Sequence, residues 1–108
     1  MTDTAALPID VVSDVLASPL LAAARAAAAV GKCRRETPLT CTMPDGTLVE
    51  GIVDLAFEAG GVWTAVDYKT DREIAAAGEA QYRRQIALYA SAIAQATGAP
   101  AAGVLVRI

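Results

Sequence analysis

The pattern of apolar and polar positions divides this chain into an Ala-rich helical region, a stretch of alternating period, a second helix and a short apolar end. The run PLLAAARAAAAV, at 19–30, consists almost entirely of strong helix formers. Ser18-Pro19 suits an N-cap followed by a first helical residue, and Gly31 suits the position just past a helix end. The pattern therefore predicts a helix that begins at Pro19 and ends before Gly31.

The first 18 residues predict one short helix and no targeting signal. Asp10 or Ser13 is a suitable N-cap for a helix that reaches Leu16. The start, MTDTAALPID, has neither the basic region nor the apolar core of a signal peptide. A cytoplasmic location is therefore expected.

After Gly31 the chain alternates between apolar and polar side chains, which is the period of a β-strand. Pro44-Asp45-Gly46 and Gly60-Gly61 interrupt this region and are typical turn sequences. Three strands are therefore expected, in the runs RRETPLTCTM, TLVEGIVDLAF and VWTAVDYKT.

The last third of the chain predicts a helix and then a buried strand. In GEAQYRRQIALYASAIAQATG, at 78–98, large apolar side chains recur at helical spacing. These side chains are Tyr82, Ile86, Tyr89 and Ile93. The unbroken apolar run GVLVRI is typical of a strand covered on both faces, and a crossover helix before it implies parallel pairing. The expected order is αβββαβ, in one α/β (α+β) domain over 1–108 with a central mixed sheet flanked by helices.

The two turns fix a strand register that brings three acidic residues into one row. A two-residue loop at Gly60-Gly61 places Asp54 directly opposite Asp67. A three-residue loop in the first hairpin places Glu36 opposite Asp54. Lys69 lies two residues beyond Asp67 and therefore on the same face.

This row of carboxylates is unfavourable for folding alone, because like charges opposite each other destabilise a sheet. A divalent cation such as Mg²⁺ or Mn²⁺ between them would reverse the sign of that interaction. In the alternative, one acid pairs with Lys69 and the others reach solvent at strand ends. Pro38 favours a bulge that would move Glu36 out of the row.

Composition excludes several other chemistries. The chain has no histidine, so Ser–His and Cys–His nucleophiles and histidine metal ligands are absent. The net charge of −3 gives no general attraction for nucleic acid. Cys33 and Cys41 are expected to be small buried side chains, too far apart along one strand to pair.

Four short motifs follow one another in the sequence: Glu36-Thr37-Pro38, GIVD at 51–54, VDYKT at 66–70 and Gln85-x-x-x-Tyr89. In this order and spacing they resemble the RecB-like nuclease family of the PD-(D/E)xK superfamily, and within it the C-terminal nuclease domain of AddA/RecB-type, UvrD-like helicase–nucleases. The resemblance runs from about Leu16 to Ile108. It implies a restriction-endonuclease-like αβββαβ core.

The resemblance also implies roles for single residues. Asp54 and Asp67 match metal ligands, the Tyr68 backbone carbonyl is a third ligand, and Glu36 is an additional candidate. Lys69 matches the lysine that orients or activates the attacking water. The implied catalytic set is Asp54, Asp67 and Lys69, with Mg²⁺ or Mn²⁺ as the cofactor.

The second predicted helix would carry the remaining site residues. Gln85 and Tyr89 match a pair that contacts DNA or braces the lysine, and their i, i+4 spacing places both on one helix face. Without the resemblance, Tyr89 would be expected in the core and Gln85 in solvent. Arg83 and Arg84 either contact phosphates or lie on a solvated helix face.

The implied function is a Mg²⁺-dependent (exo)deoxyribonuclease domain, coupled to a helicase portion or partner subunit in double-strand break repair. The alternative is a catalytically silent nuclease-fold module that binds DNA or scaffolds a partner. A chance match in an unrelated α+β domain would place Asp54 and Asp67 on different faces of the sheet. The two cysteines do not match the four-cysteine pattern of iron–sulfur relatives, so no cluster is expected.

One departure from the family concerns the metal site. Members carry a further upstream helix with a motif histidine, which this chain does not contain. The chain is therefore expected to be either the C-terminal fragment of a larger helicase–nuclease or a short stand-alone relative. Apolar surface left by the missing helix predicts self-association.

Overall fold

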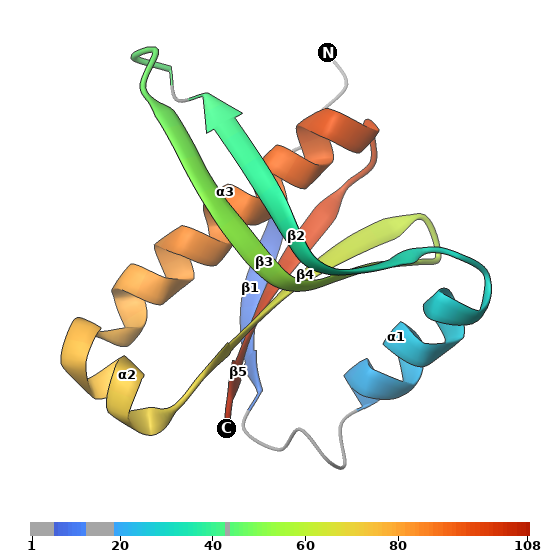
Figure 1. Cartoon of the computed structure of the whole chain (residues 1–108), viewed down its shortest axis with the longest axis horizontal. Helices are drawn as coiled ribbons and strands as arrows, with labels where there is room; N and C mark the ends of the chain where they lie inside the picture. The colour runs from blue at the N-terminus through green and yellow to red at the C-terminus, as the bar shows by residue number, and fades with distance from the viewer. Residues whose placement is uncertain (1–5, 13–18, 43) are drawn as a thin grey trace.

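The computed structural model describes residues 6–12, 19–42 and 44–108. They form a five-stranded mixed sheet with the strand order β1-β5-β4-β3-β2 and three helices (Figure 1). The elements are β1 (Ala6–Val12), α1 (Pro19–Ala29), β2 (Cys33–Thr42), β3 (Leu48–Ala59), β4 (Val62–Lys69), α2 (Asp71–Ala77), α3 (Glu79–Thr97) and β5 (Ala101–Arg107). Within this fold lies the predicted αβββαβ order, which is confirmed.

Each face of the sheet packs against one long helix. On one face, Ile86, Ala90 and Ile93 of α3 pack against Val53 and other small residues of the sheet. On the other face, Ala24 and Ala27 of α1 pack against side chains of the three central strands. These side chains are Leu55, Phe57, Val66, Val104 and Val106. The Ala-rich sequence of α1 allows its backbone to approach the sheet closely.

The two hairpins have the registers predicted from their turns. Around Gly60-Gly61, Ala59 pairs with Val62, and both glycines have the positive φ of a tight two-residue loop. In the first hairpin Thr42 pairs with Leu48. The predicted partner of Thr47, Met43, lies outside the described residues.

The parallel crossover is also confirmed. α3 ends at Gly98, whose left-handed conformation lets its N–H donate to the Ala94 carbonyl. β5 then runs parallel to β4, with Asp67 paired to Leu105 and Lys69 to Arg107. Asp67 therefore lies in a strand with neighbours on both sides, in the middle of the molecule.

The prediction of a short helix from Asp10 or Ser13 to Leu16 is wrong at Asp10. Asp10 lies in β1, an edge strand that pairs parallel with β5. The register shifts between Ala6 and Ile9, around Pro8, which has no N–H to donate. Pairing with a strand more than 90 positions away overrides the local capping signal, and Ser13 to Leu16 lie outside the described residues.

The helix α2 was not predicted, although its start has a sequence signature. The Thr70 hydroxyl accepts a hydrogen bond from the Glu73 N–H at 3.1 Å, and the Glu73 carboxylate accepts one from the Thr70 N–H at 3.1 Å. This reciprocal pair is a capping box, which requires Thr or Ser followed three residues later by Glu. It ends β4 directly after Lys69 and fixes the direction in which the chain leaves the sheet.

Among the described residues, no helix is both long enough and apolar enough to span a membrane.

Candidate active site

The alternation of the first hairpin reverses at Glu36 and Asp54. Val53 belongs to the core under α3, whereas Leu55, two residues later, belongs to the core under α1. In a regular strand these two side chains would share a face. Pairing is regular on either side, at Thr37–Val53 and Arg35–Leu55, but Glu36 and Asp54 are not paired. Glu36 has a φ of 48°, so both strands are irregular at the same level.

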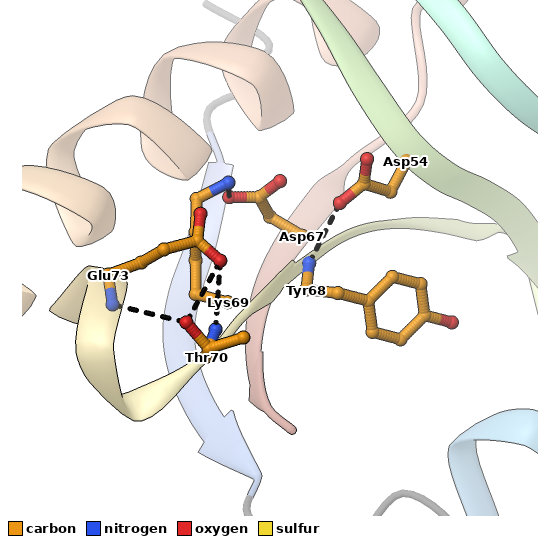
Figure 2. A network of polar contacts seen from close by, with 6 residues as sticks. All are labelled: Asp54, Asp67, Tyr68, Lys69, Thr70 and Glu73. Atoms are coloured by element: carbon orange, nitrogen blue, oxygen red, sulfur yellow. Dashed lines mark hydrogen bonds and ion pairs between the residues drawn. The ribbon is translucent and has the colours of Figure 1, made fainter.

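Asp54 uses this irregularity to reach the neighbouring strand. The last regular pair between β3 and β4 is Leu55–Val66. One position further, Asp54 Oδ2 accepts a hydrogen bond from the Tyr68 backbone N–H at 2.8 Å (Figure 2). The Asp54 carboxylate therefore takes the place that a backbone carbonyl would have as the acceptor for this N–H. The bond holds the carboxylate next to Asp67, the residue before Tyr68.

Asp67 is the buried acid of the site. It is 3 % exposed, and its Oδ2 lies 3.0 Å from Lys69 Nζ. This contact is an ion pair without hydrogen-bond alignment, so Oδ2 has no hydrogen-bond partner among the described residues. Burial and the neighbouring Asp54 carboxyl group raise the pKa of Asp67 to about 6, although Lys69 acts in the opposite direction.

Lys69 is held between Asp67 and an aromatic ring. Its Nζ lies 5.1 Å from the centre of the Tyr82 ring, within range of a cation–π contact. Burial lowers the pKa of Lys69, but the close contact with Asp67 and the charges of Asp67, Asp54 and Glu73 together raise it above its ordinary value. Lys69 is therefore an ammonium in the metal-free protein.

The structure thus brings together Asp54, Asp67 and Lys69, and the Tyr68 backbone lies between the last two. Asp54 accepts a hydrogen bond from the backbone N–H directly after Asp67 and raises the pKa of Asp67, so the two acids lie side by side and not on separate faces. Glu36 does not join them: it is exposed, and no three acidic or cysteine side chains of the described residues converge on one point. The predicted row of three acids is therefore reduced to a pair.

The pair fits a divalent cation. Two neighbouring carboxyl groups, one of them buried with an oxygen that has no hydrogen-bond partner among the described residues, supply hard oxygen donors and negative charge. A cation there would remove the repulsion that raises the pKa of Asp67. Asp54, Asp67 and the Tyr68 carbonyl are the groups that would hold it.

The three predicted residues of α3 lie in different environments. Tyr89 is buried, Gln85 is half-buried and Arg84 is exposed. Burial and, to a smaller extent, the negative charge of Asp67 raise the pKa of Tyr89. The phenol therefore lies close enough to interact electrostatically with Asp67. Tyr82, which contacts Lys69, was predicted only as a core residue; its place one turn before Gln85 on the same helix is the signal that indicates its role.

Tyr89 also explains the glycine of the GIVD motif. A Cβ at Gly51 would lie 2.1 Å from the Tyr89 hydroxyl oxygen and 2.6 Å from a ring carbon. The ring therefore packs directly on the Gly51 backbone. This contact joins α3 to β3 three residues before Asp54.

Replacing Gly51 with Ala is expected to lower the free energy of unfolding by about 1–3 kcal/mol, because the buried Tyr89 ring must move. Urea denaturation measures the change. In a Tyr89→Leu background the same substitution should have little effect, since the obstructing atoms are gone. An equal loss in both backgrounds would contradict the contact, and Glu50→Ala, on the adjacent exposed position, serves as a control.

Cys33 is a free thiol and only half-buried, less than was predicted. It packs at the edge of the core under α1. The side chain of Cys41 is not among those described.

The mixed sheet, with a parallel crossover through α3 and one helix on each face, is an α+β fold consistent with the restriction-endonuclease-like class. The model of the PD-(D/E)XK nuclease superfamily matches residues 7–108, and the chain belongs to that superfamily. The match includes β1, which the motif resemblance did not cover. Searches of curated proteins and of solved structures found no match.

Proposed function

We propose that this chain is a metal-dependent DNA nuclease domain that hydrolyses phosphodiester bonds. The observation that carries the proposal is the geometry around buried Asp67: Asp54 is bonded to the backbone N–H of the next residue, and Lys69 Nζ lies 3.0 Å from Asp67. Membership of a nuclease superfamily supports the same reaction class. An isolated acid pair of this kind has no value for folding, because it raises the pKa of one partner.

The residues divide the work as follows. Asp54, Asp67 and the Tyr68 carbonyl would hold Mg²⁺ or Mn²⁺, which would supply Lewis-acid chemistry by lowering the pKa of water and neutralising charge on the phosphate. Lys69 presents its ammonium to the same point and stabilises the negative charge that develops on the phosphoryl oxygens. Tyr82 limits the directions that the Lys69 side chain can take. Tyr89 braces β3 through Gly51, whereas Gln85 and Arg84 would contact the DNA.

The wider setting of this domain is a separate proposal, supported by the sequence motifs. We infer that it acts as an exonuclease within a cytoplasmic helicase–nuclease that processes DNA ends during double-strand break repair. The helicase portion would lie elsewhere in a longer chain or in a partner subunit. A stand-alone form would use the same two aspartates and lysine.

One observation favours a catalytically silent module as the second candidate. Among the described residues, the acid pair gains no third acidic ligand, because Glu36 is exposed and does not converge with the two aspartates. A site with two carboxylates and one carbonyl binds a cation more weakly than a fuller set would. Such a module would bind DNA without cleaving it.

Titration of the chain with MgCl₂ and MnCl₂ in a calorimeter, followed by incubation with linear DNA, distinguishes the two candidates. The nuclease predicts saturable metal binding and shortening of the DNA that stops when EDTA is added. DNA binding without cleavage would support the silent module. Neither binding nor cleavage in any metal would contradict the proposed function.

A further inference from the structure

A cleft of about 630 Å³ opens on the α1 side of the sheet, directly beside Asp54. Lys69 and Tyr82 lie on the other side, toward α3. The wall formed by α1 is mainly apolar, with Leu21 and Ala24. The opposite wall carries the polar side chains Arg35, Glu36, Asp54 and Tyr68.

We propose that this cleft binds one nucleotide of a single-stranded DNA, adjacent to the phosphodiester that is cleaved. The base would stack on Tyr68, and the backbone phosphate would lie beside Arg25 and Arg35. This inference rests on the proposed nuclease function and adds to it a preference for single strands.

The ring of Tyr68 lies where a base could stack on it. Lys69, the next residue, faces α3, so strand alternation turns the Tyr68 side chain to the face of α1, where it packs beside the core residues (Figure 2). There the ring is only partly buried, and it forms part of the wall of the cleft. An accessible aromatic ring next to a phosphodiesterase site is a stacking platform for a base.

Two arginine side chains could bind the backbone phosphate. Arg25 and Arg35 are exposed and reach the cleft from opposite walls, one from α1 and the other from β2. The charge of Arg35 is close enough to Tyr68 to oppose the rise in the pKa of that phenol. A phosphate between the two guanidinium groups would therefore lie within one nucleotide of a base on Tyr68.

The shape of the cleft favours a single strand. Its volume is within the range of sites that enclose a small ligand, which suits one nucleotide. Bases in a duplex are stacked and paired, so they cannot turn into a cleft between a helix and a sheet without being unpaired. A single strand can turn a base out without that loss.

Arg34 and Arg35 provide a matched pair of substitutions. Both are exposed and adjacent on β2, but Arg34 lines a separate pocket on the α3 side, with Trp63 and Ile93. Binding is measured by fluorescence anisotropy with a labelled eight-residue oligothymidylate and with a duplex of equal length. A Lys69→Met background in Mg²⁺ prevents cleavage during the titration.

Arg35→Ala is expected to weaken binding of the single strand about 5–10-fold and to reduce the slope of log K against log salt by about 0.7. Arg34→Ala should change neither quantity. Tyr68→Leu should weaken binding about 5–20-fold, and Tyr68→Phe, which keeps the ring, should restore it. Circular dichroism confirms that each variant is folded.

Equal losses for Arg34→Ala and Arg35→Ala, or unchanged binding by Tyr68→Leu, would overturn the cleft proposal. Tighter binding of the duplex would do the same. If the wild-type chain still cleaves DNA in these cases, the nuclease function stands and only the cleft is wrong. If the wild-type chain neither binds nor cleaves DNA, both proposals fail.

Discussion

Replacing Asp67 with Asn is expected to make the metal-free protein more stable and to abolish its response to Mg²⁺. Burial and Asp54 raise the pKa of Asp67 to about 6, so the folded state prefers a neutral group at this position. Asn supplies one without changing the shape of the side chain. The expected gain at neutral pH is about 1 kcal/mol, because the loss of the Lys69 partner offsets part of the relief.

The pH dependence of this effect has a definite sign. An acid whose pKa is higher in the folded state binds more protons when folded, so the free energy of unfolding falls as the pH rises. For Asp67 the fall extends from about pH 4 to about pH 6. Hydrogen bonds to neighbouring residues lower the pKa values of Asp45, Glu73 and Glu79, so these groups act at or below the lower end of that window and with the opposite sign. Asp67→Asn should therefore remove the slope between pH 4 and pH 6.

Thermal denaturation with and without Mg²⁺ measures both halves of this prediction. The wild-type chain should gain stability with metal, whereas Asp67→Asn should gain none and should cleave DNA on the order of 10³-fold more slowly. Glu50→Gln removes one exposed negative charge from β3 and serves as the control. Metal-dependent stabilisation that survives in Asp67→Asn would place the cation elsewhere.

Replacing Lys69 with Met is expected to lower the cleavage rate by about 10²–10⁴-fold while metal binding is retained. The ammonium is not a metal ligand, but it lies 3.0 Å from Asp67 and would face the same phosphate. Because Met keeps most of the length of the side chain, packing against Tyr82 should be preserved.

Single-turnover cleavage rates, measured beside calorimetry with Mn²⁺, separate the two effects. Lys32 is the one other lysine in the sequence and forms an ion pair with Glu58 at 3.1 Å, so Lys32→Met is a matched control. Lys69→Arg should recover part of the rate, because it restores the charge without the same geometry. A Lys69→Met protein with the wild-type rate would remove this lysine from the mechanism.

Much of the fold could be predicted from local patterns. The glycine turns fix both hairpin registers, and the helical spacing of Ile86, Tyr89 and Ile93 identifies the buried face of α3. These features depend on neighbouring residues only. β1 could not be predicted in this way, because it depends on pairing with β5 at the far end of the chain.

The site was predictable in composition but not in geometry. The register set by the Gly60-Gly61 turn predicts Asp54 beside Asp67, and in the structure the two acids are neighbours. The same reasoning added Glu36, because it assumed that strand alternation continues without interruption. The reversal at Glu36 and Asp54 depends on how the hairpin bends over two different cores, which no local pattern records.

That reversal makes Asp54 a joint in the molecule. The part of the hairpin near its turn packs on α3 through Gly51 and Val53. The part near its base also packs on α1, through Leu55 and Phe57. Asp54 lies between these two parts of the hairpin, whereas Asp67 and Lys69 lie on β4, the central strand of the sheet. A substitution that tilts one core against the other therefore changes the separation of the Asp54 and Asp67 carboxyl groups. Core residues far from the site thus set its geometry.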